Sequence, residues 1–406
     1  MKLLLFVITI LSFTACNKAS TDPITPIVTV DSFTVSVNNG YGTGKYKIGD
    51  TVDIFSVAYA DNELFDKWSG DAALLNGPEE WHSWFVMPNR NVSFTGSLKT
   101  IAPVTLTLEQ IRGRDRMKPV YSFFPAGHKG FVYLLHGTGG TAQNTATNYE
   151  FKQLIKDLVA DNFGVIITEA EEATTGVDAN GDGKLRWLVS PVDSVTNIDY
   201  ANIKIITDTF YNRGLTSRSK LRYSAGMSNG GNFSAYLSAF YKYKAGISYC
   251  APAGLAASTT TTPLQFCMAR YDNNENVGPT GNAAALSNSQ TISGRGICSK
   301  YFIKEHAPLY PERFARRGDI TIAKSVAVFN ELKSKGYLNN RNYFIGFSDV
   351  LINAYTASPA SFPELNSLTT LQKIFVVEQV DLSVSDHQMY SDYNRATLKF
   401  FNTQCL

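Results

Sequence analysis

The stretch that decides the fold runs from Lys220 to Phe240, KLRYSAGMSNGGNFSAYLSAF, where an apolar run meets a glycine-rich turn and then a helical pattern. This pattern predicts a buried strand over Leu221–Gly226 and a helix over Asn229–Ala239, with Ser228 at the corner between them. A residue on such a corner is strained, and its hydroxyl is exposed above the end of the sheet. Ser228 is therefore a candidate nucleophile.

The residues around Ser228 fit a corner that carries chemistry. Gly226 and Gly230 flank it because a tight corner leaves no room for Cβ atoms between strand and helix. The backbone N–H of Asn229 begins the helix and points toward the same place as the hydroxyl, so it can stabilise an oxyanion. A glycine-rich corner without chemistry would show the same residues, so the interpretation needs further parts.

Strand and helix patterns alternate on both sides of this corner. Buried parallel strands read as continuous apolar runs, and their alternation with helices indicates a doubly wound, mostly parallel α/β sheet. The predicted strands are Pro119–Phe124, Gly130–Leu135, Val165–Ala170, Ala245–Cys250, Pro263–Ala269 and Lys373–Val380. The predicted helices are Asn148–Ala160, Asp199–Asn212, Ile320–Lys335 and Gln388–Phe401. Residues 101–406 are thus expected to form one α/β domain.

A second glycine-rich loop, His136-Gly137-Thr138-Gly139-Gly140, directly follows the predicted strand Gly130–Leu135. Such a loop can bring backbone N–H groups close to a substrate oxygen. Thr138 or Gly139 is expected to supply an oxyanion donor beside that of Asn229. His136 is expected to shape this loop rather than act as a base.

These two motifs, in this order, resemble the α/β-hydrolase superfamily, in particular its secreted polyhydroxybutyrate depolymerase-like and feruloyl esterase-like enzymes. The resemblance covers about three hundred residues and implies serine esterase chemistry, with the triad in the chain order Ser, Asp, His. The acid is then expected at Asp272, after the strand Pro263–Ala269, although Met268-Ala269-Arg270-Tyr271-Asp272 keeps only the Asp of the family's usual Gly-Thr-X-Asp turn. Asp349, Asp381 and Glu275 remain alternatives.

The base is expected on a loop near the C-terminus, after the last strand. Among the five histidines only His387 has this position, in Ser385-Asp386-His387. A histidine that merely caps the last helix is the alternative. His82 falls outside the α/β domain, and His128 and His306 have no assigned role.

Residues 27–100 differ from the rest of the chain, because short alternating strands are separated there by turn residues. A small all-β module is the expected fold. Tyr46-Lys47-Ile48-Gly49-Asp50-Thr51-Val52, Phe65-Asp66-Lys67-Trp68-Ser69-Gly70-Asp71 and Val86-Met87-Pro88 resemble the β-repeat modules related to internalin B-repeats, which implies a spacer or adhesion role. Trp81 and Trp84 could form a sugar-binding surface, or they could belong to the module's core.

The N-terminus has the form of an export signal. Met1–Ala15 is a lysine followed by an apolar run too short to span a bilayer, and it ends in small residues before Cys16. Residues 1–16 resemble a bacterial lipoprotein signal, which implies lipidation of Cys16, whereas a plain signal peptide is the alternative. Residues 17–26 read as a polar linker. We expect an exported lipoprotein, periplasmic or at the cell surface, that meets the membrane through its lipid anchor only.

Composition limits the partners and the covalent links. A formal net charge of +2 and the lack of a basic run give no case for nucleic acid, while 44% hydrophobic residues can fill large cores. Besides Cys16 there are four cysteines, Cys250, Cys267, Cys298 and Cys405. Export permits disulfides, and four cysteines allow three pairings that the sequence does not rank.

One loop has the spacing of a cation site. Asp178, Asn180 and Asp182 place oxygen side chains at alternate positions, with Gly183 at the sixth, like the first half of a calcium loop. The twelfth position is Val189, where a calcium loop needs a glutamate, so a remote carboxylate would have to complete the site. A plain Asx-turn loop is the alternative. The triad chemistry itself requires no cofactor, and any calcium would be structural.

The substrate is the part that the sequence leaves open. Residues 278–317 and 337–371 are weakly periodic and are expected to form a lid or pocket wall. They do not distinguish a feruloyl ester, an acetyl ester on a polysaccharide, or a polyester. An adhesion or glycan-binding lipoprotein with an inactive hydrolase domain, and a serine peptidase, are the alternative functions.

Overall fold

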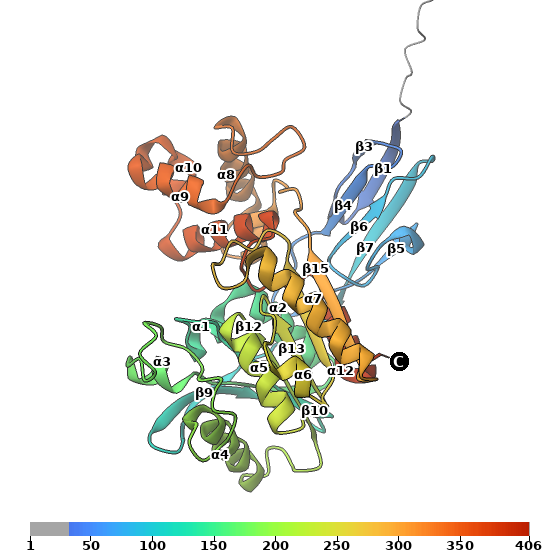
Figure 1. Cartoon of the computed structure of the whole chain (residues 1–406). Coiled ribbons are helices and arrows are strands. Elements are labelled where there is room, and N and C mark those ends of the chain that lie inside the picture. Colours follow the sequence, from blue (N-terminus) through green and yellow to red (C-terminus); the bar gives the residue numbers. More distant parts are fainter. Residues whose placement is uncertain (1–31, 406) are drawn as a thin grey trace, which may run out of the picture.

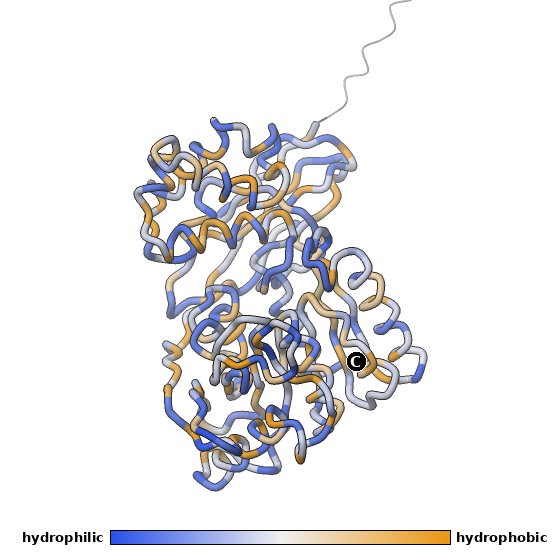
Figure 2. The backbone as a smooth tube through the Cα atoms, turned by 60° about the vertical axis from the view of Figure 1, so that its left-hand side comes forward, coloured by the Kyte–Doolittle hydropathy of each residue, from blue (hydrophilic) through white to orange (hydrophobic). Residues whose placement is uncertain are grey.

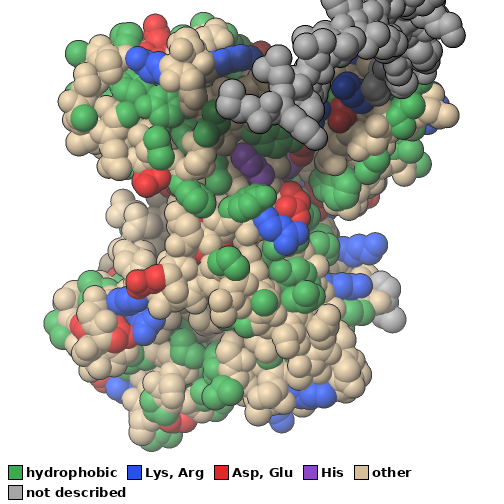
Figure 3. All heavy atoms as spheres, turned by 45° about the horizontal axis from the view of Figure 1, so that its top comes forward, with side chains coloured by type: hydrophobic (Ala, Val, Ile, Leu, Met, Phe, Trp, Pro, Cys, Tyr) green, Lys and Arg blue, Asp and Glu red, His purple; other side chains and the backbone are tan. Residues whose placement is uncertain are grey.

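The structure is a computed structural model, and it describes residues 32–405. The N-terminal signal, the linker and Cys16 lie outside this range. Figure 1 shows an α/β part at the bottom, with a β-rich part and a group of helices side by side above it. On the face drawn in Figure 3, histidine, acidic and basic side chains gather at the narrow waist between the upper and lower parts.

The α/β part is built on an eight-stranded sheet with the order β15-β14-β13-β12-β10-β11-β9-β8. The strands from β15 to β11 are parallel, and β9 and β8 complete the sheet as antiparallel neighbours. The strands are β8 (Thr107–Arg112), β9 (Met117–Phe123), β10 (Gly130–Leu135), β11 (Phe163–Ile167), β12 (Leu221–Met227), β13 (Ala245–Tyr249), β14 (Leu264–Ala269) and β15 (Ser299–Lys304). The predicted mostly parallel α/β sheet, in the strand order of an α/β-hydrolase, is confirmed.

Helices cover both faces of this sheet, because strands β10, β11, β13 and β14 are buried at every position. Along β10, Val132 and Leu134 join the core under helices α2 and α12, whereas Phe131 and Tyr133 join the core under α4 and α5. Buried strands of this kind form only between two helical layers. The helices of the α/β part are α1 (Ala142–Thr147), α2 (Tyr149–Ala160), α3 (Glu171–Thr175), α4 (Ile198–Asn212), α5 (Asn229–Phe240), α6 (Ala256–Thr259), α7 (Gly278–Gly294) and α12 (Asn394–Thr403).

A helical insertion lies between β15 and the loop of His387, and it has an apolar core of its own. Figure 2 shows polar and apolar segments alternating along these upper helices, as expected for helices that bury one side. The insertion comprises the 3-10 helix η2 (Arg313–Arg317), α8 (Ile322–Ser334), α9 (Ser348–Ala357), η3 (Pro359–Ser361), α10 (Pro363–Asn366) and α11 (Thr370–Val384).

Helix α11 overturns one prediction, because Lys373–Val380 is helical and not the last strand. Thr369 and Gln372 form a capping box that starts the helix. Phe375, Val376, Gln379 and Val380 are buried, and this spacing is that of a helix face. The apolar run was mistaken for a strand because β-branched residues dominate it.

Other boundaries also differ from the prediction. The sheet ends at β15, which was not predicted because its polar residues Lys300 and Lys304 interrupt the apolar run. Strand β8 was likewise missed. Residues 278–294, expected to be an irregular insert, form helix α7, which packs on β14 and β15. The last helix begins at Asn394 and not at Gln388.

The β-rich part, called the β-module below, contains strands β1 to β7 in a four-stranded and a three-stranded sheet around one core. Trp81 is buried in this core, and Trp84 is half-buried. The strands are β1 (Ser32–Asn38), β2 (Gly40–Tyr41), β3 (Gly44–Lys47), β4 (Thr51–Ser56), β5 (Glu63–Gly70), β6 (His82–Val86) and β7 (Val92–Thr100), with the 3-10 helix η1 (Ala72–Leu74) after β5.

The core of the β-module is completed by residues from far along the chain. Ala307 and Tyr310, which follow β15, belong to it. The Arg316 guanidinium lies 3.6 Å from the centroid of the Trp81 ring and is itself buried. Removing the module would expose these groups, so residues 101–406 depend on it for part of their packing.

Buried polar contacts also join the β-module to the α/β part. His82 places Nδ1 2.5 Å from Asp392 and Nε2 2.9 Å from Asp53. Glu80 accepts the backbone N–H groups of Arg395 and Ala396, which begin helix α12. The segment that follows His387 is therefore held by the β-module.

One disulfide, Cys298–Cys405, joins the start of β15 to the end of α12 across 107 residues of chain. Cys250 and Cys267 are free and buried, as small apolar side chains are. No helix among residues 32–405 is long and apolar enough to cross a membrane.

Candidate active site

Ser228 lies at a strained corner directly after β12, at the carboxyl end of the parallel sheet. Its backbone has φ 57° and ψ −124°, a conformation that residues with a Cβ rarely adopt. A Cβ on Gly226 would lie 2.2 Å from the carbonyl oxygen of Gly230, and one on Gly230 would lie 2.2 Å from that of His136. Both glycines are thus needed for the close approach of strand and helix.

Three polar side chains from distant parts of the chain meet at this corner. Ser228 Oγ lies 2.9 Å from His387 Nε2, and His387 Nδ1 lies 2.7 Å from Asp272 Oδ2. Because an ionised carboxylate only accepts, Nδ1–H donates to Asp272 and Nε2 is left to accept the Ser228 hydroxyl. The geometry is that of a nucleophile, a base and an orienting acid.

Asp272 reaches this position because β14, the strand before it, lies two places from β12 in the sheet. Its side chain is fully buried. None of the alternative acids hydrogen-bonds to His387: Asp349 is on the exposed side of α9, Asp381 accepts from Gln388, and the side chain of Glu275 is 81% exposed. The structure therefore brings together Ser228, Asp272 and His387.

A second carboxylate, Asp386, ties the acid loop to the base loop. Its Oδ1 accepts the backbone N–H of Asn273 at 2.9 Å and that of His387 at 2.6 Å. Burial raises the pKa of Asp386, an effect that these two N–H donors oppose. No role was predicted for Asp386 from the sequence.

Of the predicted oxyanion donors, Asn229 and Thr138 line the cavity at Ser228. Asn229 is the first residue of α5, where backbone N–H groups have no acceptor within the helix. Gly139 does not fit the prediction, because its N–H donates to the Leu185 carbonyl at 2.8 Å. The backbone before it does approach the nucleophile: a Cβ on Gly137 would lie 3.2 Å from that of Ser228.

His136 holds this loop in place as a neutral ring. Its Nε2 accepts the N–H of Ala170 at 3.0 Å, so Nδ1 carries the proton and donates to the Gly137 carbonyl at 2.7 Å. Burial lowers the pKa of His136 to about 4. The ring therefore stays uncharged at neutral pH and shapes the loop, as expected from the sequence.

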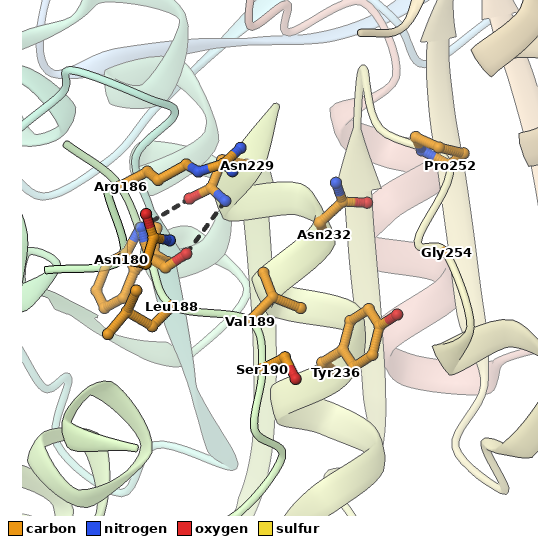
Figure 4. Close-up of a pocket in the computed structure, with 11 residues that line it drawn as sticks. Asn180, Arg186, Leu188, Val189, Ser190, Asn229, Asn232, Tyr236, Pro252 and Gly254 are labelled. Atoms are coloured by element: carbon orange, nitrogen blue, oxygen red, sulfur yellow. Dashed lines mark hydrogen bonds between the residues drawn. The ribbon is translucent and has the colours of Figure 1, made fainter. Parts of the chain in front are cut away.

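Two connected cavities open beside Ser228. The first, of about 460 Å³, contains Ser228 and His387 and is rimmed by polar side chains that include Lys184, Arg186 and Glu275. The second, of about 330 Å³, shares three residues with it and extends over apolar groups; the shared residues are Arg186, Asn229 and Asn232. Figure 4 shows this second cavity between the segment that contains Leu188 and Val189 and helix α5, where Tyr236 lies.

Trp187 fixes the loop that lines the second cavity, and no sequence signal predicted this role. Its backbone N–H and C=O pair with the side-chain amide of Asn229, as the dashed lines in Figure 4 show. Its indole N–H donates to the His136 carbonyl, and its ring stacks on Phe233 with centroids 4.8 Å apart. Arg186 and Asn232 were not predicted to line the site either.

The loop of Asp178, Asn180 and Asp182 lies at the edge of this region and is exposed. The Asp178 carboxylate accepts the backbone N–H groups of Gly181, Asp182 and Gly183, and Asp182 pairs with Arg186. These hydrogen bonds account for the residue pattern as an Asx-turn loop. A calcium ion in this loop stays a prediction, and the proposed reaction uses none.

Within residues 32–405, one group of three possible metal-ligating side chains lies close together, and it comprises Cys250, Asp272 and His387. Two of the three are the acid and base described above, so their lone pairs and protons are already paired. Cys250 is buried beneath them, and burial raises the pKa of its thiol. The hydrogen bonds among Ser228, His387 and Asp272 account for this group without a metal ion.

Comparisons with known proteins do not show a family for this chain. No protein-family model matches the chain, and no curated protein is similar enough in sequence to match it. Among solved structures, a dienelactone hydrolase from Anabaena variabilis is 14% identical with a TM-score of 0.39, over 50% of this chain and 87% of its own. Est1E from Butyrivibrio proteoclasticus, solved with ferulic acid, is 13% identical with a TM-score of 0.35, over 48% and 90%. An acylaminoacyl peptidase from Pyrococcus horikoshii is 11% identical with a TM-score of 0.34, over 66% and 50%.

Proposed function

We propose that this protein is a serine carboxylic-ester hydrolase that acts through an acyl-enzyme. The observation that carries the proposal is the hydrogen-bonded series from Ser228 through His387 to Asp272, at 2.9 and 2.7 Å. It lies at the carboxyl edge of a parallel sheet, where α/β enzymes bind their ligands. The strained backbone of Ser228 supports the same proposal, since such strain persists where function requires it.

In the proposed reaction His387 Nε2 takes the Ser228 proton while Oγ attacks the ester carbonyl. Asp272 holds the imidazole in the required tautomer and stabilises the imidazolium. The N–H of Asn229 and the loop at Thr138 hold the oxyanion, and losing one such donor costs about 3 kcal/mol of transition-state stabilisation. His387 then protonates the leaving alcohol, and a water molecule, activated by the same base, releases the acid from the acyl-enzyme.

The two cavities suggest which esters fit. The polar rim at Ser228 suits a hydroxyl-rich group such as a sugar, and the second cavity suits an apolar or aromatic group. A feruloyl or acetyl ester on a polysaccharide meets both conditions, and a polyester meets the second.

The proposal also includes export and a lipid anchor at Cys16, because of the sequence features of residues 1–16. The protein would then contact the membrane through that anchor only. The proposal includes no nucleic acid partner.

The proposal is tested by hydrolysis of p-nitrophenyl acetate, methyl ferulate and a soluble polyester oligomer by the mature protein. Ser228→Ala is the inactive variant, and Ser224→Ala, a buried serine in β12, is the matched control. We expect turnover with at least one ester, lost in Ser228→Ala only. A folded wild-type protein that neither hydrolyses these esters nor reacts at Ser228 with an organophosphonate would contradict the proposal and favour a binding protein with an inactive hydrolase domain.

A further inference from the structure

A cavity of about 700 Å³ lies away from Ser228, between the β-module and the residues that follow β15. It is larger than the catalytic cavity and within the range of small-molecule sites, about 300–1,000 Å³. One wall consists of residues 40–55 of the β-module, and the other of residues 308–312 and 340–343. The proposed esterase reaction uses none of these residues.

Contacts across the cavity hold its two walls at a fixed separation. The Arg341 guanidinium lies 3.4 Å from the Asp50 carboxylate, and the Tyr343 hydroxyl donates to Asp53 at 3.4 Å. The ring of Tyr41 stacks on that of Tyr310, with centroids 4.5 Å apart and planes 17° apart. A ligand would therefore meet a preformed site and would not have to order its walls.

The lining combines aromatic rings with hydrogen-bonding groups of both charges. Tyr41, Tyr46 and Tyr343 are half-buried, so part of each ring is available to a ligand. The charged lining residues are balanced, with three basic side chains, Lys45, Lys47 and Arg341, and three acidic ones, Asp50, Asp53 and Glu312.

The chemistry of this lining excludes two classes of ligand, polyanions and lipid chains. A polyanion needs an excess of basic groups, and a lipid chain needs a mainly apolar wall. A neutral sugar fits both features at once, since its C–H faces pack on tyrosine rings and its hydroxyls donate to carboxylates and accept from lysine and arginine. The tyrosine hydroxyls add further partners of both kinds.

A row of aromatic rings connects this cavity to the acid loop of the catalytic site. Tyr343 packs edge to face against His306, with centroids 4.9 Å apart, and His306 packs in the same way against Tyr271, at 6.1 Å. Tyr271 is half exposed and directly precedes Asp272. A chain-like ligand that left the cavity along these rings would arrive at the catalytic loops.

We infer that the cavity between the β-module and residues 308–312 and 340–343 binds a neutral oligosaccharide chain, at a site separate from the catalytic cavity. The β-module then acts as half of a carbohydrate site rather than as a spacer. The inference does not depend on the esterase proposal, because binding is measured without turnover.

The test is titration calorimetry of the full mature Ser228→Ala protein with xylohexaose, cellohexaose and mannohexaose. Tyr46→Ala changes one wall and Arg341→Ala the other, and Arg341 is exposed enough for its replacement to leave the fold intact. Tyr211→Ala, a half-buried tyrosine on α4 under Arg218, is the matched control. Polygalacturonate and an extended tetrapeptide are the competing ligands, since β2 and β3 are edge strands that could pair with a peptide.

We expect at least one of the neutral hexasaccharides to bind. Its affinity should fall about tenfold or more in Tyr46→Ala and in Arg341→Ala and should be unchanged in the Tyr211→Ala control. When Ser228 is kept, the Tyr46→Ala and Arg341→Ala variants should hydrolyse p-nitrophenyl acetate at the wild-type rate. Three results would each overturn the inference. These are no hexasaccharide binding, binding that Tyr46→Ala and Arg341→Ala do not weaken, and binding of the peptide or polygalacturonate in place of sugar.

Discussion

Replacing Asp386 by alanine tests whether the distance between the acid and base loops limits catalysis. The change leaves two backbone N–H groups, those of Asn273 and His387, without the acceptor they share. An unsatisfied buried donor costs about 1–3 kcal/mol, so two fully buried donors would cost about 2–6 kcal/mol. Because both N–H groups are only partly buried, the free energy of unfolding should fall by about 2–4 kcal/mol. Once His387 is free to shift, a displacement of about 1 Å should lower kcat about 100-fold.

Asparagine at the same position separates geometry from charge, because its side-chain oxygen can still accept both N–H groups. We expect Asp386→Asn to keep kcat on p-nitrophenyl acetate within about tenfold of the wild type. Asp381→Asn, which alters another buried carboxylate on the same segment, is the control and should leave kcat unchanged. Thermal unfolding of each variant identifies loss of fold. An alanine variant as active as the wild type, or an asparagine variant as impaired as the alanine one, would refute the reasoning.

Three further changes have expected outcomes. Gly230→Ala should abolish activity and lower stability, because its Cβ would lie 2.2 Å from the carbonyl oxygen of His136; ester turnover and thermal melting measure both effects. Burial raises the pKa of Glu80 to about 8, above its unfolded value of 4.5. The stability that Glu80 contributes is therefore complete below pH 4.5 and is lost as pH rises through 8. Glu80→Gln should flatten this dependence of the free energy of unfolding on pH, as measured by urea unfolding across that range. Replacing Cys298 and Cys405 by serine should lower the free energy of unfolding by about 2–5 kcal/mol, because the disulfide closes a loop of 107 residues, and a reductant should then have no further effect.

The central part of the fold was predictable from the sequence because its signals are local. Strand β10 is a continuous apolar run, and Gly226, Ser228 and Gly230 define a corner whose geometry follows from the absence of Cβ atoms. The triad order that the resemblance implies then favoured Asp272 and His387, with Asp349, Asp381 and Glu275 as alternative acids, and the structure brings Asp272 and His387 to Ser228.

The insertion before His387 was misread because its signals are tertiary. Helix α11 is rich in valine, and its helical character comes from the capping box at Thr369 and from packing in a separate helical core. Strand β15 contains lysines, and it is recognisable only through its pairing with β14. Nothing in the local sequence shows that Asp386 would accept N–H groups from two loops.

The contacts of the β-module limit how the N-terminal part of this protein can be exchanged in evolution. Glu80 and His82 hold the segment that follows His387, and Tyr310 fills the core of the module itself. A recombination point at residue 100 looks natural in the sequence, but it would separate the candidate base, His387, from part of its support. Exchange of N-terminal modules among enzymes of this type should therefore require matched changes near residues 307–316 and 391–396, so that both ends of the chain are inherited together.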